Sequence, residues 1–279
     1  MYRSGKEAPC SFPKAESGQR TAESESPMNI VVFIQARLSS SRLPGKVLKD
    51  LGGQPLLVWA VERCRRAHSP SRVVVATTDD PADDPIAGLC QERGYEVFRG
   101  SQFDVLDRFY QAARSFGAEV IVRITADCPF IDPSLLDETV EAFLRLRPDF
   151  AATRLPPPWK RTYPIGLDVE VCAFAGLERT WKEAVLKHER EHVMPYFYDQ
   201  EGRFQLHILQ HEPDFGRLRW TVDTPEDLEL LRQIAARFPG RMDFSWGEIL
   251  ALLEREPELN QINAAVQHKT GLDVDARMQ

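Results

Sequence analysis

The chain has 279 residues, of which 43% are hydrophobic and 28% charged, and its formal net charge is −7. This composition is typical of a soluble globular protein, and the negative charge argues against non-specific binding to a nucleic-acid backbone. No apolar run approaches the roughly 20 residues that a bilayer-spanning helix needs, and residues 1–27 lack the apolar core of a signal peptide. We therefore expect a cytoplasmic protein.

Three segments are predicted along the chain. Residues 1–27 are rich in Ser, Glu, Lys, Gly and Pro, which predicts a disordered N-terminal extension. Residues 28–255 are predicted to form the folded domain, in which residues 151–215 are an inserted segment for substrate or dimer contacts. Residues 256–279 are predicted to be a C-terminal tail.

Apolar runs alternate with amphipathic stretches through the first half of the folded domain. Buried strands are predicted at 29–35, 72–78 and 119–125, with a shorter strand at 95–98. Helices are predicted at 55–67, 83–93, 103–117 and 133–146. This alternation implies an α/β fold, a mainly parallel sheet with helices on both faces. Ligands of such sheets bind beyond the carboxyl ends of the strands.

The pattern changes after residue 150. Residues 166–174 and 203–210 alternate in hydrophobicity, which predicts half-exposed strands, and residues 176–199 between them are predicted to be helical. Residues 217–223 are predicted to form another buried strand. A helix at 224–238 is predicted to follow, with Thr224 as its N-cap.

A basic segment, "ARLSSSRLPGK" (36–46), directly follows the first predicted strand. It contains Arg37, Arg42 and Lys46, with Lys49 close behind and no acidic residue among them. Such a segment can be an exposed basic turn, but its place at the end of a buried strand favours an anion site. Two arginines and a lysine suit a triphosphate. The segment matches neither a Walker A loop nor G-x-G-x-x-G.

Two aspartates end predicted strands and precede proline-containing turns. Asp127 follows strand 119–125, and Asp223 ends the predicted strand 217–223. Each could simply form a turn or cap a helix. Their matched placement instead predicts that both reach the sheet edge beside the basic segment, where two carboxylates and nucleotide phosphates could bind Mg²⁺.

The stretch "HEREH" (188–192) matches H-E-x-x-H and therefore raises the alternative of a zinc peptidase. A zinc site needs a third protein ligand, and no G-x-x-H continuation follows. Pro195 also interrupts the helix that would present the two histidines. A solvated helix turn is the ordinary explanation of such a run of charged residues.

Three motifs, "QARLSSSRLPGKVL", "VRITADCPFID" and "VDTPEDLE", together resemble the cytidylyltransferases that activate acidic sugars, such as the CMP-KDO and CMP-N-acetylneuraminate synthetases. "FRGSQFDVLDRFYQAA" and "YPIGLDVEV" favour the SpsF branch of that family, which is named for spore coat polysaccharide biosynthesis. The resemblance covers roughly 29–240. It implies a nucleotide-diphospho-sugar transferase (GT-A, Rossmann-like) fold, a nucleotidyltransferase domain at 28–255 and a homodimer.

The resemblance also implies a reaction and its residues. A Mg²⁺-dependent enzyme would transfer CMP from CTP to an acidic sugar or sugar phosphate and release pyrophosphate, in surface or spore-coat polysaccharide biosynthesis. The implied catalytic residues are Arg37, Lys46 and Asp127, and the implied magnesium ligands are Asp127 and Asp223. The implied nucleotide-binding residues are Ala36, Arg37, Ser41, Arg42, Lys46, Thr77, Asp79 and Arg108. The hypothetical acceptor pocket consists of Arg154, Tyr163, Asp168, Glu170, Arg190 and His192.

Two departures from the KDO enzymes argue against KDO itself as the acceptor. Those enzymes have Pro-Ala-Arg where this chain has Gln35-Ala36-Arg37, and an acidic residue where it has Cys128. A GT-A glycosyltransferase that uses an activated sugar is an alternative, although such enzymes usually carry an Asp-x-Asp pair at the metal. A catalytically inactive nucleotide-binding partner of a sugar pathway is another.

Overall fold

A computed structural model describes residues 28–155 and 161–267. The predicted N-terminal extension and the last part of the predicted tail lie outside these residues. The described chain forms one large sheet flanked by helices, with a separate hairpin of β2 (Asp50–Leu51) and β3 (Gln54–Pro55). The strands of the large sheet are, in spatial order, β5 (Glu96–Gly100), β4 (Arg72–Thr78), β1 (Ile30–Gln35), β6 (Val120–Thr125), β8 (Glu170–Ala173), β7 (Phe150–Ala152) and β9 (Leu206–Ile208).

The sheet is mainly parallel, as the alternation of strands and helices predicted. Strands β5, β4, β1 and β6 pair in parallel, and β8 is antiparallel to both of its neighbours. Strand β9 then pairs in parallel with β7. The basic segment and Asp127 follow β1 and β6, which are adjacent, so both begin at the same edge of the sheet.

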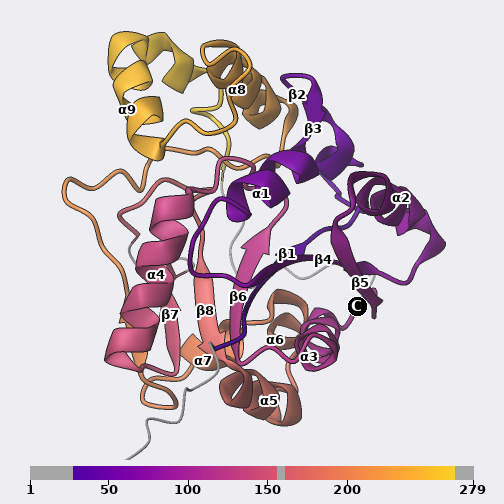
Figure 1. Ribbon diagram of the computed structural model, residues 1–279. Coiled ribbons are helices and arrows are strands. Elements are labelled where there is room, and N and C mark those ends of the chain that lie inside the picture. The colour runs from indigo at the N-terminus through magenta and orange to yellow at the C-terminus, as the bar shows by residue number, and fades with distance from the viewer. Residues whose placement is uncertain (1–27, 156–160, 268–279) are drawn as a thin grey trace, which may run out of the picture.

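Helices cover both faces of the sheet (Figure 1). Along β1, the even-numbered side chains of 30–34 pack into one buried cluster with residues of α1 (Leu56–Cys64), α2 (Asp84–Arg93) and α4 (Pro133–Leu146). Val31 and Phe33 point to the opposite face and pack with residues of α3 (Val105–Ser115), α5 (Phe174–Glu183) and α7 (Pro195–Tyr198). Strand β1 is therefore buried on both sides, as its continuous apolar run predicted.

A third apolar cluster lies under α8 (Pro225–Ala236) and α9 (Trp246–Arg255), the orange and yellow helices of Figure 1. Thr224 caps α8 as predicted, and it forms a reciprocal capping box with Asp227. The short helix η3 (Pro257–Gln261) packs against both α8 and α9. Part of the predicted tail is therefore folded against the body of the protein.

The prediction of a buried strand at 217–223 is wrong. Apart from a single bridge between Arg219 and Ile165, these residues have no strand pairing in the described structure. The apolar run is buried because Trp220 and Val222 pack in the cluster under α8 and α9, not because a sheet covers them. Asp223 still reaches the predicted edge, because the Val222 amide donates to the Asp127 carbonyl oxygen at 2.8 Å.

The prediction of a strand within 166–174 is confirmed by β8, but the prediction that this strand is half-exposed is wrong. Strand β8 lies between β6 and β7 inside the sheet and is almost entirely buried. The polar residue of β8, Glu170, does not face solvent, and its carboxylate pairs with the buried Arg123. Alternation of polar and apolar residues here reflects buried ion pairs.

Gly166 lies where the segment before β8 passes close to the segment that leads to Asp223. Its φ is +105°, and a Cβ there would lie 2.6 Å from the Trp220 carbonyl carbon. We expect Gly166→Ala to lower the free energy of unfolding by roughly 3 kcal/mol, from backbone strain plus overpacking. Urea denaturation would measure this loss.

Gly202→Ala provides a matched control. Gly202 also has a positive φ, +77°, but a Cβ added there would meet no atom of the described structure within 4 Å. Strain alone should then cost about 1 kcal/mol. Equal losses in the two variants would show that the contact with residues 220–221 has no steric consequence.

Candidate active site

Three predicted site residues, Lys46, Asp127 and Asp223, converge at the carboxyl edge of the parallel strands. The Lys46 Nζ donates to Asp127 Oδ2 at 2.6 Å and to Asp223 Oδ1 at 2.8 Å. It also donates to the Val222 carbonyl oxygen at 2.8 Å, and Lys46 is only 8% exposed. Lys46 opens the short helix η1 (Lys46–Leu48), and Gly45 before it adopts the left-handed conformation, φ 68°.

The Asp223 carboxylate is surrounded by cations. Besides Lys46, it pairs through Oδ2 with Arg42 at 2.8 Å and with Arg219 at 2.7 Å. Although burial alone would raise the pKa of Asp223, the Lys46 ammonium and the neighbouring guanidinium groups lower it well below its usual range. Asp223 is therefore an ionised carboxylate.

A second layer of polar contacts, which the sequence did not reveal, fixes Arg219. Its Nε donates to Asp227 Oδ1 at 2.9 Å, and Asp227 is fully buried. Asn263, 6% exposed, donates through Nδ2 to the same oxygen at 2.9 Å and to the Arg219 carbonyl oxygen at 3.0 Å. The Asp227 carboxylate also accepts the Asp223 amide at 2.9 Å, so this network orients Asp223.

Asp127 and Asp223 together supply two carboxylates, which are the type and the number of protein ligands that a magnesium ion commonly has. Among residues 28–155 and 161–267, no group of three or more His, Cys, Asp or Glu side chains could hold a metal. Magnesium is commonly held by one or two carboxylates, with water and substrate phosphates as its other ligands. Asp127 retains a side-chain exposure of 25% and Asp223 one of 18%, so both remain reachable.

Cys128, which follows Asp127, is a neutral thiol. It is buried, and burial together with the Asp127 and Asp168 carboxylates raises its pKa. Its Sγ lies 3.7 Å from Asp127 Oδ1 and 3.7 Å from Thr221 Oγ1. These contacts are those of a packing residue, and the influence of Asp168 on the pKa of Cys128 indicates that the two residues are neighbours.

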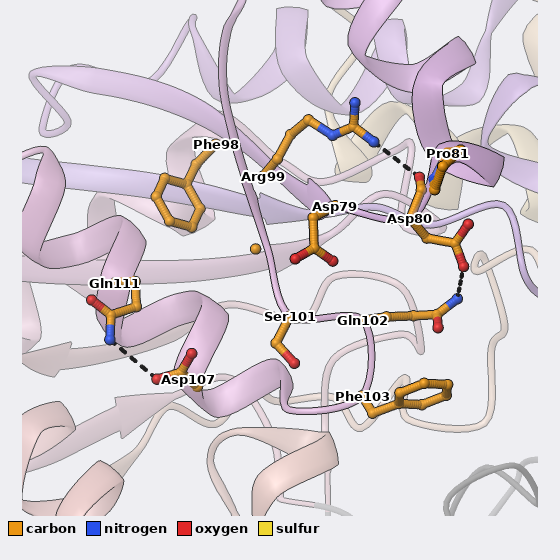
Figure 2. Close-up of a pocket in the computed structure, with 11 residues that line it drawn as sticks. Asp79, Asp80, Pro81, Phe98, Arg99, Ser101, Gln102, Phe103, Asp107 and Gln111 are labelled. Carbon is orange, nitrogen blue, oxygen red and sulfur yellow. Dashed lines mark hydrogen bonds between the residues drawn. The ribbon is translucent and has the colours of Figure 1, made fainter.

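A polar pocket of about 730 Å³ opens at the ends of β4 and β5 (Figure 2). Asp79 from the end of β4 lies between Phe98 of β5 and Gln102 of the following loop. The full lining of the pocket consists of Asp79, Asp80, Pro81, Phe98, Arg99, Gly100, Ser101, Gln102, Phe103, Asp107 and Gln111. The basic segment adjoins it, because the Leu38 amide donates to Asp83 at 2.7 Å, and Asp83 ends the helical turn Pro81–Asp83.

Two other predicted nucleotide residues, Thr77 and Arg108, lie behind this pocket and are fully buried. Arg108 donates through Nη1 to the Ser101 carbonyl oxygen at 2.7 Å, but its Nε and Nη2 meet no hydrogen-bond partner within the described chain. Burial, reinforced by the positive charge of Arg37, lowers the pKa of Arg108 to about 10. Thr77 Oγ1 is likewise buried without a partner there.

The remaining residues of the predicted nucleotide site lie on the basic segment itself. Ala36 is buried, and its amide donates to the Ala76 carbonyl oxygen at 3.2 Å, which continues the pairing of β1 with β4. Arg37 forms an ion pair with Glu191 at 3.7 Å, and Ser41 is exposed. The segment is therefore a loop pinned at both ends, by β1 and by Lys46.

Three of the six predicted acceptor residues come together in a charged cluster, in which Glu170 is buried and Arg154 and Asp168 are half-buried. Arg154 pairs with Asp168 at 3.3 Å and with Glu170 at 3.8 Å. Although burial alone would lower it, the pKa of Arg154 is raised by these two carboxylates. Arg161, which the sequence analysis missed, donates through Nη2 to Asp168 at 2.7 Å. Its buried Nη1 has no hydrogen-bond partner among the residues that the structure describes.

The other predicted acceptor residues do not join this cluster. Tyr163 is buried in the apolar cluster under α9, with its ring 5.7 Å from that of Trp246. Arg190 donates to Asp104, the N-cap of α3, at 3.0 Å and to the Trp181 carbonyl oxygen at 2.7 Å. His192 ends α6 (Lys187–His192), whose Glu191 faces Arg37.

The "HEREH" residues have contacts that explain them without zinc. Glu189, the candidate base, accepts the backbone amides of Val185 and Leu186 at 3.1 and 2.9 Å and so caps α6. His188 Nε2 lies 2.7 Å from an Asp199 carboxylate oxygen. The helix ends at His192, where Val193 takes a φ of 71°.

No helix within the described ranges is both long and apolar enough to traverse a bilayer.

Comparisons with known proteins agree with this geometry. Residues 31–270 match the family model described as cytidylyltransferase. The spore coat polysaccharide biosynthesis protein SpsF of Bacillus subtilis is 34% identical to this chain over 83% of this chain and 97% of its own length. The 3-deoxy-manno-octulosonate cytidylyltransferase of Chlorobium limicola is 32% identical, over 77% of this chain and 100% of its own length.

One solved structure is similar to this protein in both fold and sequence. It is that of a cytidylyltransferase from Leptospira borgpetersenii, 33% identical, which superposes with a TM-score of 0.80 over 86% of this chain and 100% of that one. The resemblance carried by the basic segment and by the two aspartate motifs is thus confirmed, and the chain belongs to the cytidylyltransferase family.

Proposed function

We propose that this cytidylyltransferase transfers CMP from CTP to a sugar acceptor, an acidic sugar or a sugar phosphate, with Mg²⁺ and release of pyrophosphate. The observation that carries the proposal is the convergence of Lys46, Asp127 and Asp223 at the strand edge beside the polar pocket. The names of the relatives, SpsF and 3-deoxy-manno-octulosonate cytidylyltransferase, support a sugar acceptor and a role in polysaccharide synthesis.

The nucleotide is proposed to bind across the ends of β1, β4 and β5. The polar pocket would take its base, because its lining combines three carboxylates, two amides and a hydroxyl with two phenylalanine rings. Asp79 can accept a hydrogen bond from an exocyclic amino group such as that of cytosine. The triphosphate would then lie along the basic segment, where Arg37 and Arg42 supply planar guanidinium groups and Ser41 a hydroxyl.

The transfer itself requires positioning and charge neutralisation. An acceptor oxygen attacks the α-phosphorus, and the bond from that phosphorus to the oxygen that bridges it to the β-phosphate breaks. Pyrophosphate leaves with the bridging oxygen, and where the acceptor is a hydroxyl its proton passes to water. Arg42 and Lys46 would hold the phosphates in line, while Asp127 and Asp223 would bind the magnesium ion. When bound, that ion supplies charge neutralisation at the α-phosphate and at the leaving pyrophosphate.

The acceptor is proposed to bind near Cys128, against Arg154, Arg161, Asp168 and Glu170. Buried guanidinium and carboxylate groups can bind both an anionic substituent and sugar hydroxyls. Arg161 Nη1 is buried without a described partner, so it can donate to a ligand at no loss of a protein contact. Tyr163 and Arg190 are engaged in packing and helix capping, and the structure gives them no such role.

Two alternatives are less well supported. A GT-A glycosyltransferase would place a second aspartate near Asp127, and the neighbouring residue is instead the neutral thiol of Cys128. An inactive nucleotide-binding protein would not need an oriented carboxylate pair with a shared lysine. The homodimer, the cytoplasmic location and the division into segments at 28, 151, 215 and 256 remain predictions.

Pyrophosphate release tests the reaction directly. With Mg²⁺ and a panel of acidic sugars and sugar phosphates, we expect pyrophosphate release from CTP and much less from ATP, GTP or UTP.

Asp127→Asn should lower kcat at least about 100-fold, since it removes one metal-binding charge, while the exposed Asp243→Asn should have little effect. Hydrolysis of a nucleotide sugar, without pyrophosphate release from any NTP, would favour the glycosyltransferase.

Arg161 tests the acceptor site. Arg161→Met keeps the length and apolar stem of the side chain but removes the donors, so the KM for the acceptor should rise about 10-fold or more, equivalent to about 1.4 kcal/mol. The KM for CTP should be unchanged. Steady-state kinetics with each substrate varied would measure both, with Arg145→Met on the exposed face of α4 as control. An unchanged acceptor KM would contradict the assignment.

A further inference from the structure

The Lys46 ammonium uses all of its hydrogen-bond donors on the metal site. It has three N–H groups, and it makes three bonds, to Asp127 Oδ2, Asp223 Oδ1 and the Val222 carbonyl oxygen. With 8% of its surface exposed, Lys46 has no room for a further partner from solvent. It can therefore contact a nucleotide phosphate only by leaving at least one of these three oxygens.

The two carboxylates that Lys46 bridges are those proposed to hold the metal ion. Asp223 presents its Oδ2 to Arg42 and Arg219 and only its Oδ1 to Lys46. A divalent ion held by Asp127 and Asp223 would therefore compete with the Lys46 ammonium for these carboxylates. Two carboxylates this close repel each other unless a cation neutralises them. In this structure the Lys46 ammonium supplies that cation.

We propose that Lys46 is the resident counter-ion of the metal site. In the nucleotide-free protein its ammonium takes the place of the divalent ion between Asp127 and Asp223. When the metal–nucleotide complex enters, the ion takes over the carboxylates and Lys46 passes to the phosphates. This inference rests on the proposed nucleotide and metal sites, and it adds that metal and nucleotide bind interdependently.

The surrounding contacts allow this exchange. Arg219, which Asp227 holds in place, keeps Asp223 Oδ2 neutralised while Lys46 leaves Oδ1, so Asp223 does not have to reorient. Lys46 stands on a loop that reaches the phosphates in the proposed binding mode, and its four-carbon stem can swing without movement of the main chain. The exchange conserves hydrogen bonds, since each donor lost on a carboxylate is regained on a phosphate oxygen.

Metal binding without nucleotide tests the proposal. The affinity of the full chain for Mn²⁺, used as a paramagnetic substitute for Mg²⁺, can be measured by electron paramagnetic resonance of the free ion. Lys46→Met removes the competing charge, so we expect it to bind Mn²⁺ at least 10-fold more tightly than the natural protein. Lys49→Met, a nearby lysine outside the cluster, should leave the affinity unchanged. Unchanged or weaker binding by the Lys46 variant would overturn the proposal.

Thermal melting gives a second readout. Without metal, Lys46→Met leaves two carboxylates facing each other and should melt at a lower temperature than the natural protein, and added Mn²⁺ should raise its Tm by more. If that variant does not fold, Lys46→Gln retains a hydrogen-bond donor without the charge and should show the same gain in affinity. Equal Tm increases in variant and natural protein would count against the exchange.

An aspartate variant separates this inference from the proposed function. If Mn²⁺ binds the natural protein and Asp127→Asn weakens that binding, the metal assignment stands, and an unaltered affinity in Lys46→Met then overturns only the counter-ion role. If Mn²⁺ binds none of these proteins, with or without CTP, both the metal assignment and the counter-ion role fail.

Discussion

The buried ammonium of Lys46 holds together segments that are far apart in sequence. It joins the loop after β1 to Asp127 after β6 and to Asp223 before α8. A lysine this deeply buried is costly unless its charge is compensated, and the two carboxylates provide that compensation. The same contact fixes the distance between the basic segment and both aspartates, on which any binding of metal and phosphate depends. The same ion pairs therefore stabilise this edge of the sheet and position the side chains of the proposed active site.

Asp223 is oriented by the beginning of α8 and by a residue close to the described C-terminal end. Asp227 closes the capping box of α8 and also binds Arg219, the Asp223 amide and Asn263. A single buried carboxylate therefore couples a helix N-terminus to a site residue. Asn263 extends this coupling to the segment after η3, which explains why a stretch with the composition of a tail is folded against the body.

The sequence predicted the sheet, most helices and the convergence of Lys46, Asp127 and Asp223, because each depends on local periodicity or on position at a strand end. It could not predict contacts that depend on tertiary packing. Residues 217–223 read as a strand because a buried apolar run has the same pattern whether a sheet or two helices cover it. Arg161 and Asn263 carry no local signal, since their partners are distant in sequence or lie in loops.

The charged cluster around Asp168 shows why alternation in β8 was misleading and why that error bears on function. Burying Glu170 within β8, and half-burying Arg154 and Asp168 beside it, costs desolvation energy that apolar residues would avoid. Their mutual pairing offsets this cost but does not by itself explain the choice of charged residues. Arg161 adds a guanidinium with a nitrogen that the described protein leaves unpaired. The proposed acceptor site would give that arrangement a physical reason, because a polar, charged sugar needs partners of this kind.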